Sequence, residues 1–323
     1  MQKGVGLVAE VEGDTSARWR ASNLEMAQLL QRRPFVVTKL GQLWRLVRES
    51  HEQPMAGVSR LPELVTPEEL GVTFIGHSSF LLQVGGKNVL VDPVFSKRLI
   101  LLRRQRRAGL LVKDLPAIDV VLLTHAHMDH LDVASLRRVV WATQRLTGKA
   151  PEVVVPTGVE DLVARLGFAR VHEMEWWQQL EVQGLRVTMT PCRHWGARMF
   201  NDTHRGYGGY VVESGGYSVY HSGDTAYFDG FSEIGRRLKP EVALLPIGAY
   251  FPDSYRAVHT SPEEAARAFM DVGAEWMVPM HFGTFRLGRE PMEEPVKRLG
   301  AEAERLEIGE RVRVLEEGET LRL

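Results

Sequence analysis

The chain has 323 residues, of which 44% are hydrophobic and 25% charged, so it holds enough apolar material for a large core. Forty basic residues against 41 acidic ones leave a formal charge of −1, which argues against a globally basic nucleic-acid binder. The single cysteine, Cys192, excludes an internal disulfide and a zinc site built from several cysteines. The sequence shows no long apolar run and no apolar stretch of a secretory signal near its start, so we expect a cytoplasmic protein.

The hydrophobic pattern divides the chain at about residue 70. Between residues 23 and 49 apolar side chains recur every three or four positions, and Pro34 separates two helical pieces. We therefore expect residues 1–70 to form a helical extension that either closes a homo-oligomer or shields a pocket. Residues 71–323 are expected to form one large domain.

From residue 71 the apolar period changes to the alternation of β-strands, and Gly85-Gly86 marks a hairpin turn. Helical patterns between the strands are typical of a layered α/β domain whose sheets are covered by helices. The chain is expected to end in a hairpin of residues 311–315 and 320–323. Further strands are expected at residues 88–92, 118–124, 152–156, 185–190, 209–213, 217–221, 242–246 and 276–280, and helices at 157–166, 231–238, 262–272 and 293–305.

A cluster of histidines begins at the end of the strand expected at residues 118–124. His125 and His127 are two residues apart and point to the same side of an extended segment, while Asp129 and His130 come from the turn beyond it. Zinc binds imidazole nitrogen and carboxylate oxygen, but four ligands this close in sequence cannot all serve one open catalytic ion. The motif therefore predicts two adjacent metal ions.

Three further candidate ligands follow later strands. His194 comes after the strand at 185–190, Asp224 after the strand at 217–221, and His281 after the strand at 276–280. A lone histidine at a strand end is more often structural, but these three follow the cluster in an order that completes two ligand sets. Zinc suits such nitrogen and oxygen donors, and iron or manganese is compatible with them.

In this order of residues the chain resembles the metallo-β-lactamase superfamily of hydrolases, over about residues 71 to 285. The resemblance implies an α/β fold in the form of an αββα four-layer sandwich, here with a helical N-terminal extension. It implies that Asp92 orients a ligand histidine. It also implies two Zn²⁺ ions, the first held by His125, His127 and His194, the second by Asp129, His130 and His281, with Asp224 bridging both.

A narrower resemblance is to the N-acyl-phosphatidylethanolamine-hydrolysing phospholipases D. It implies that a hydroxide shared by the two ions attacks the phosphorus of a phosphodiester, with Asp129 orienting that hydroxide. The substrate implied is a phospholipid or a small molecule with a phosphodiester bond. The matching segments, several of which have no metal-binding role, are residues 91–96, 115–119, 130–132, 175–177, 194–195, 223–225, 246–250, 261–265 and 281–285.

Other residues near these segments have two interpretations each. His259 precedes a helix and is expected either to act in catalysis by contacting the substrate or to cap that helix. His77 and His221 are interpreted as structural, His77 because it lies in an early strand turn far from the ligand run. Aromatic candidates for lining an apolar pocket, which are otherwise core residues, are Trp195, Tyr250, Phe251 and Phe282.

Residues 97–107 combine six cations with four aliphatic side chains. Such a run is either a solvated loop or a peripheral contact with anionic lipid head groups, here at the inner membrane face. Because the run directly follows Asp92 and Pro93, we expect it near the site.

Three functions compete at this stage. A di-zinc phosphodiesterase of the phospholipase D type agrees with the matching segments. A hydrolase of the same fold acting on a lactone, β-lactam, thioester, cyclic phosphate or nucleic acid shares the metal ligands, since substrate choice depends on pocket loops. No nucleic-acid partner is expected, because the net charge is near zero and no nucleic-acid domain is added. The third hypothesis is a metal-stabilised binding protein without catalysis.

Overall fold

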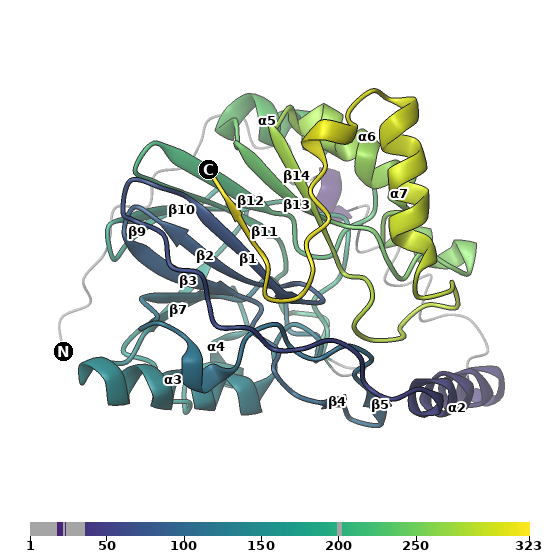
Figure 1. Ribbon diagram of the computed structural model, residues 1–323, viewed down its shortest axis with the longest axis horizontal. Helices are drawn as coiled ribbons and strands as arrows, with labels where there is room; N and C mark the ends of the chain where they lie inside the picture. The colour runs from purple at the N-terminus through teal and green to yellow at the C-terminus, as the bar shows by residue number, and fades with distance from the viewer. Residues whose placement is uncertain (1–17, 22, 24–35, 199–201) are drawn as a thin grey trace.

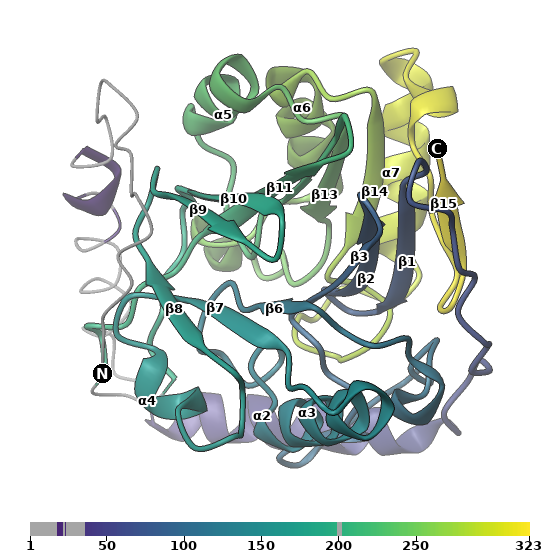
Figure 2. The ribbon, with the colours of Figure 1, turned by 90° about the vertical axis from the view of Figure 1, so that its left-hand side faces the viewer.

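The computed structural model describes residues 18–21, 23, 36–198 and 202–323 of the chain, and two large β-sheets lie face to face in its centre (Figures 1 and 2). The first sheet has the strand order β15 (Thr320–Arg322), β1 (Gly71–Gly76), β2 (Ser79–Val84), β3 (Lys87–Val91), β6 (Val120–Leu122), β7 (Glu152–Pro156) and β8 (Val171–Met174). The second has the order β14 (Trp276–Met280), β13 (Val242–Pro246), β12 (Tyr217–His221), β11 (Gly209–Ser214), β10 (Leu185–Thr190) and β9 (Gln179–Val182).

The two sheets repeat one plan of pairing. In the first, antiparallel strands β1 to β3 are followed by the parallel strands β6, β7 and β8. In the second, antiparallel strands β9 to β12 are followed by the parallel strands β13 and β14. Because parallel strands end at the same edge of their sheet, the residues that follow them are gathered there.

Helices cover the outer face of each sheet (Figure 2). Alternate side chains of one strand serve the two faces, as in β2, where Phe80 and Leu82 join the core shared with the second sheet while Leu81 packs in the cluster of Leu136 and Val139. The predicted αββα sandwich is thereby confirmed. The covering helices are α3 (Val133–Thr147) and α4 (Glu160–Val163) on the first sheet, and α5 (Gly230–Leu238), α6 (Pro262–Val272) and α7 (Glu294–Arg305) on the second.

Part of the predicted N-terminal helical extension is present as α2 (Val36–Glu52). Its C-terminal end meets the short hairpin of β4 (Arg98–Leu99) and β5 (Leu102–Arg103), where the Arg103 backbone N–H donates to Ser50 Oγ at 3.1 Å. Pro34 and the neighbouring residues 24–35 lie outside the described residues, so the break predicted there and the extension's role stay predictions. Within the described part of the chain, no helix is long and apolar enough to cross a membrane.

The C-terminal hairpin predicted for residues 311–323 is wrong. After a short 3-10 helix (Gly309–Arg311), Val312 makes an isolated bridge to Met277 of the second sheet, and β15 then pairs with β1 of the first. The two segments therefore bind different sheets and not each other, because each sheet offers an unpaired edge strand at this side. Two further short 3-10 helices are Val112–Asp114 and Asp253–Ala257.

Candidate metal centre

The loop between β6 and α3 carries the histidine cluster, and Asp92 at the end of β3 fixes its shape. Asp92 accepts hydrogen bonds from the Thr124 backbone N–H (2.8 Å), the Thr124 hydroxyl (2.6 Å) and His130 Nδ1 (2.6 Å). This leaves His130 Nε2 buried and pointing into the site, 3.3 Å from Asp224 Oδ2. Arg198 braces the same loop, since its guanidinium donates to the carbonyl groups of Ala126 and Leu131. The sequence pattern gave no sign of that arginine.

The second sheet supplies the other three predicted ligands from the ends of its strands. His194 follows β10, and its Nδ1 donates to the Val258 carbonyl at 3.0 Å, which turns Nε2 toward His127. Asp224 follows β12 and His281 follows β14, and both side chains are buried. The sandwich thus places candidate ligands from both sheets at one edge.

All seven predicted ligand residues lie together, in two groups of candidate ligands, and a third group joins Asp224 and His281 to His259. His125, His127, His194 and Asp224 form the first group, and their candidate ligand atoms lie within 4.8 Å of one another. His125 Nε2 is 2.8 Å from His127 Nδ1, and His194 Nε2 is 3.3 Å from the same atom. Asp224 Oδ2 reaches toward both groups, at 3.9 Å from His194 Nε2 and 3.0 Å from His281 Nε2.

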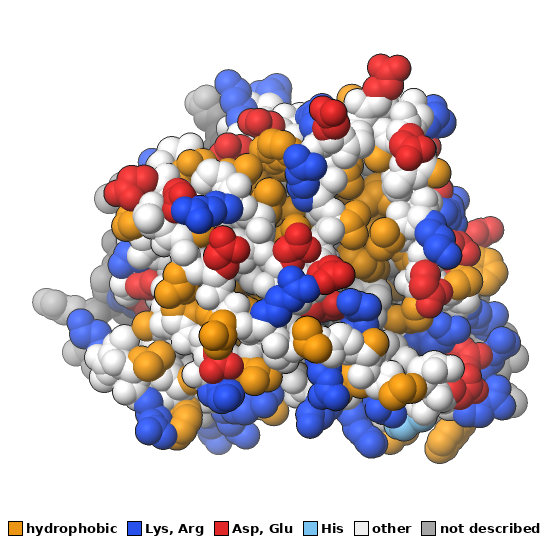
Figure 3. Space-filling model, viewed as in Figure 1, with side chains coloured by type: hydrophobic (Ala, Val, Ile, Leu, Met, Phe, Trp, Pro, Cys, Tyr) orange, Lys and Arg blue, Asp and Glu red, His pale blue; other side chains and the backbone are white. Residues whose placement is uncertain are grey.

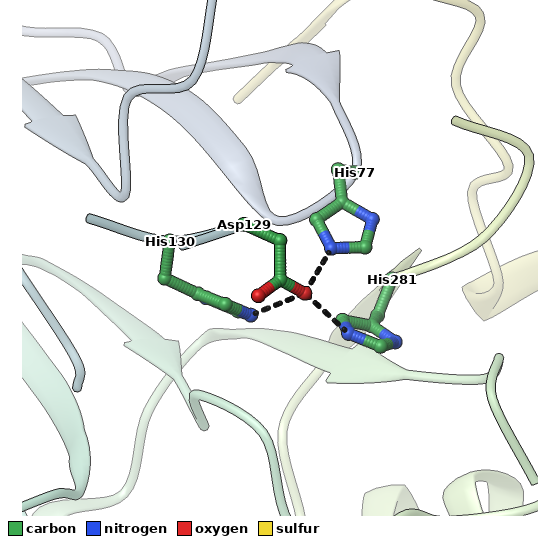
Figure 4. A group of neighbouring side chains, drawn as sticks. All are labelled: His77, Asp129, His130 and His281. Atoms are coloured by element: carbon green, nitrogen blue, oxygen red, sulfur yellow. Dashed lines mark hydrogen bonds and ion pairs between the residues drawn. The ribbon is translucent and has the colours of Figure 1, made fainter. Parts of the chain in front are cut away.

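The second group contains a residue that sequence reasoning had placed elsewhere. Figure 4 shows His77, Asp129, His130 and His281 around one carboxylate oxygen. Asp129 Oδ2 lies 3.0 Å from His77 Nε2, 3.6 Å from His281 Nε2 and 3.7 Å from His130 Nε2. The prediction that His77 lies away from the ligand run is therefore wrong. Its position after the first strand of the sheet, in Gly-His-Ser-Ser, was the available signal.

The protonation states of the first group and of both carboxylates suit metal binding, whereas, against the effect of burial, the carboxylates of Asp224 and Asp129 raise the pKa of His130 well above its usual value and that of His281 to about 9. Burial lowers the pKa of His127 to about 4 and lowers the pKa of His125 and His194 well below the usual value, so these imidazoles are neutral. Burial would raise the pKa of the Asp129 and Asp224 carboxyl groups, but the neighbouring histidines, His130 first, hold both well below the ordinary value. Neutral imidazole and ionised carboxylate are the forms that bind a metal.

Unsatisfied buried atoms mark the same place. Among the described residues, His281 Nδ1 and Asp224 Oδ1 are buried without a hydrogen-bond partner, and His130 Nε2 and His281 Nε2 face only carboxylate oxygens of Asp129 and Asp224. Buried polar groups are normally hydrogen-bonded, so such a concentration needs a further binding partner. Nitrogen and oxygen donors in two adjoining groups fit a pair of divalent cations.

The other two histidines singled out in the sequence, His259 and His221, have different surroundings. His259 lies beside the cluster, with Nδ1 3.8 Å from Asp224 Oδ2 and its ring stacked on His281, and burial lowers its pKa to about 3. His221 bonds the Ser78 carbonyl through Nε2 and accepts from the Gly223 N–H at Nδ1, so both its nitrogens are used within the fold. Ser261, not His259, caps α6, with Glu264 completing the capping box.

Of the four aromatic candidates, two lie next to the cluster. Trp195 packs edge-on against the ring of His127, at 4.8 Å between centroids. Phe282 lines a hollow beside His281 that also includes Phe285 and Arg286. Tyr250 is a core residue whose hydroxyl donates to Glu294, and Phe251 is exposed. Of the four aromatic residues predicted to line an apolar pocket, only Trp195 and Phe282 therefore lie next to the cluster.

Comparison with known proteins agrees with this geometry. Residues 87–282 match the Beta-lactamase superfamily domain family. A metal-dependent hydrolase of Methanopyrus kandleri is 34% identical over 77% of this chain and 98% of its own length. The mitochondrial N-acyl-phosphatidylethanolamine-hydrolyzing phospholipase D of Saccharomyces cerevisiae is 31% identical over 72% of this chain and 51% of its own length. An uncharacterized protein of Mycobacterium tuberculosis is 36% identical, over 81% and 73% respectively.

The chain therefore belongs to the β-lactamase superfamily domain family, among its metal-dependent hydrolases. Among solved structures, the metallo hydrolase Igni18 of Ignicoccus hospitalis superposes with a TM-score of 0.60 at 27% identity, covering 79% of this chain and 98% of that one. A diiron β-hydroxylase of Streptomyces venezuelae shares the fold at a TM-score of 0.60 and 20% identity, over 80% of this chain and 55% of that one. The predicted superfamily and fold are confirmed.

Proposed function

We propose that the protein is a di-zinc hydrolase that cleaves a phosphodiester bond, with an N-acyl phospholipid as the substrate. The observation that carries the proposal is the pair of adjoining histidine and carboxylate groups with Asp224 reaching into both. Two metal positions sharing a carboxylate suit in-line displacement at phosphorus, because two ions can neutralise the attacking and the leaving oxygen together. The similarity to the yeast enzyme, which is named for hydrolysis of N-acyl-phosphatidylethanolamine, supports the substrate.

In this proposal, the ligand residues keep the division described above. When bound, the two ions would supply a water-derived nucleophile near neutral pH and draw charge from the phosphate oxygens. The first position belongs to His125, His127 and His194, the second to Asp129, His130 and His281, and Asp224 serves both.

The surrounding residues fix those ligands in one state. Asp92 holds the proton of His130 on Nδ1, and the Val258 carbonyl does the same for His194, so that each Nε2 is free for a metal. Asp129, whose side chain is 14% exposed, is the acidic ligand best placed to orient a reacting water. His259 is 12% exposed and neutral, and we assign it a hydrogen bond to the substrate.

The test uses purified protein loaded with Zn²⁺, presented with vesicles containing N-acyl-phosphatidylethanolamine in H₂¹⁸O. Attack at phosphorus places one ¹⁸O in the phosphate of the phosphatidic acid product, and N-acylethanolamine leaves with its own oxygen. Mass spectrometry of both products reads the position of the label. Zinc-stripped protein should lose turnover and regain it when zinc is returned.

Two further substrates distinguish the proposed reaction from the alternatives. A simple aryl phosphodiester tests the bond without the lipid, and a homoserine lactone tests the competing class. Turnover of the lactone with neither phosphodiester cleaved would overturn the proposal. Cleavage of the aryl diester alone would keep the bond and reject the lipid.

We further propose a peripheral contact with an anionic membrane, and the fold narrows where it lies within residues 97–107. Arg104 is buried, and Arg106, whose side chain is 40% exposed, is paired with Glu317 at 2.6 Å, so both cations have partners within the protein. The turn of the β4–β5 hairpin instead presents Ile100, 72% exposed, and Leu101, 48% exposed. Apolar side chains flanked by cations suit an anionic interface.

Vesicle flotation measures this contact. The substitutions Ile100→Glu and Leu101→Glu should reduce binding to anionic vesicles, while Leu61→Glu, at a 76% exposed position outside the hairpin, serves as the matched control. Equal binding of these three variants and the wild-type protein would remove the hairpin from the proposal.

A further inference from the structure

The backbone of His77 is held in an unusual conformation. Its φ is +61°, in the left-handed region that is uncommon for residues other than glycine, and its side chain is fully buried at the turn between β1 and β2. Such backbone strain persists only where the surroundings enforce it, and it concentrates at functional sites. We therefore consider the contacts that this conformation gives His77.

Contacts on every side enforce the conformation. The His77 N–H donates to the Thr284 hydroxyl at 2.7 Å, and its carbonyl accepts from the His281 N–H at 2.8 Å. The imidazole stands edge-on to Phe285, whose ring also faces the guanidinium of the buried Arg104. Gly76, which precedes His77, has φ +123°, a conformation that residues with a Cβ rarely adopt, and a Cβ there would also lie 2.6 Å from an Arg104 nitrogen.

His281 shares the unusual backbone, also with φ +61°. The hydrogen bond between the two residues joins the turn after β1 in the first sheet to the loop after β14 in the second. The two rings lie 4.3 Å apart between centroids. The strained turn therefore places the His77 ring next to a candidate ligand of the second metal position.

In its hydrogen bond to Asp129, His77 can only be the donor. Its Nε2 lies 3.0 Å from Asp129 Oδ2, and an ionised carboxylate only accepts hydrogen bonds, so His77 carries its proton on Nε2 (Figure 4). Nδ1 is buried and has no partner. His130 and His194 are arranged the other way, since the fold occupies Nδ1 of each and leaves Nε2 for a ligand. His77 therefore lacks the supported ligand arrangement of those two residues.

We propose that His77 is a positioning residue that holds the Asp129 carboxylate toward His130 and His281 without binding a metal itself. The proposal rests on the metal site of the proposed function. The role of His77 makes the second metal position depend on the β1–β2 turn, although that turn contributes no predicted ligand. Without the His77 donor, the partly exposed Asp129 side chain can rotate, and the second ion loses one fixed ligand.

Cobalt(II) is a suitable probe because its binding to the metal-stripped protein is followed directly by visible absorbance. The wild-type protein should bind two ions. His77→Leu should weaken the second ion roughly 10–100-fold, the effect expected when an outer hydrogen-bond partner of a ligand is removed, and should leave the first unchanged. His77→Gln keeps a side-chain N–H donor and should restore most of the lost affinity.

Two controls separate positioning from folding and from direct ligation. His172→Leu makes the same change at a histidine outside the cluster, bonded to Glu152, and should leave both ions unaffected. Thermal unfolding of each metal-stripped variant shows whether the fold is intact. His281→Ala gives the signature of a lost ligand at the second position.

Two results would overturn the inference. Wild-type cobalt affinity in His77→Leu would show that the contact has no effect. Complete loss of the second ion in His77→Gln, as in His281→Ala, would make His77 a ligand. Failure of the wild-type protein to bind cobalt would instead refute the proposed metal site itself, so the two failures are distinguishable.

Discussion

Asp92 and Asp224 occupy corresponding places in the two sheets. Each follows the strand at which its sheet changes from antiparallel to parallel pairing, β3 for Asp92 and β12 for Asp224, and both are buried. Their surroundings differ. Asp92 accepts three hydrogen bonds from Thr124 and His130, whereas Asp224 has one oxygen without any partner and another facing only imidazole rings.

The difference shows how the same structural position serves two purposes. The carboxylate of Asp92 is satisfied by the protein and therefore acts on its neighbours, fixing the loop and the tautomer of His130. One oxygen of Asp224 has no hydrogen-bond partner in the described part of the protein and the other faces only histidine side chains, so this carboxylate is available to a cation. Both carboxylates are buried, so burial does not separate the orienting residue from the candidate ligand. The number of hydrogen bonds that each accepts from the protein does.

The largest expected effect is at Asp224. Asp224→Asn replaces the one candidate ligand shared by both groups with a neutral amide, so turnover should fall on the order of 10³-fold or more. Added zinc should raise the unfolding temperature of the wild-type protein but not that of this variant. Metal content and thermal unfolding with and without zinc are the measurements. A variant that keeps two bound ions would contradict the comparison.

An intermediate effect is expected at Asp92. Asp92→Asn keeps the size of the side chain but weakens the acceptors of Thr124 and His130, so zinc affinity should fall roughly 10–100-fold without being abolished. The metal-free protein should also lose about 1–3 kcal/mol of unfolding free energy, since a buried donor is left unsatisfied. Chelator competition and urea unfolding measure the two quantities. Unchanged stability with complete metal loss would make Asp92 a ligand.

The smallest effect on metal binding is expected at His221. Both of its ring nitrogens are hydrogen-bonded within the fold, so His221→Gln should cost about 1–3 kcal/mol of unfolding free energy and leave zinc stoichiometry at the wild-type value. Urea unfolding and metal analysis of the same preparation check both parts. Loss of an ion in this variant, with the fold intact, would show that satisfied histidines also belong to the site.

Much of the fold and of the site could be predicted because both depend on local patterns. Alternating apolar residues and hairpin turns predict most strands, and parallel strands bring their ends together whatever the loop lengths. His125, His127, Asp129 and His130 stand within six residues, so their proximity needed no knowledge of the fold. Their arrangement as a metal site stays a prediction that metal analysis will test.

The features that were missed depend on contacts between distant segments. His77 lies 52 residues before Asp129, and its ring reaches that carboxylate only through a left-handed turn enforced by Thr284 and His281. Likewise, the cations of residues 97–107 form one run in sequence, yet Arg104 is buried while neighbouring Arg103 is only half-buried. Apart from the position of His77 directly after a strand, no pattern within either segment indicates these contacts.

The C-terminal segment has a consequence for the sandwich as a whole. Val312 bridges to β14 and β15 completes the edge at β1, so one short stretch of chain fastens the two sheets together. The candidate centre takes Asp129 from one sheet and His281 from the other, with 3.6 Å between Asp129 Oδ2 and His281 Nε2. The C-terminal tail therefore links the two layers through backbone pairing to both, and the geometry of the centre depends on how the layers lie relative to each other.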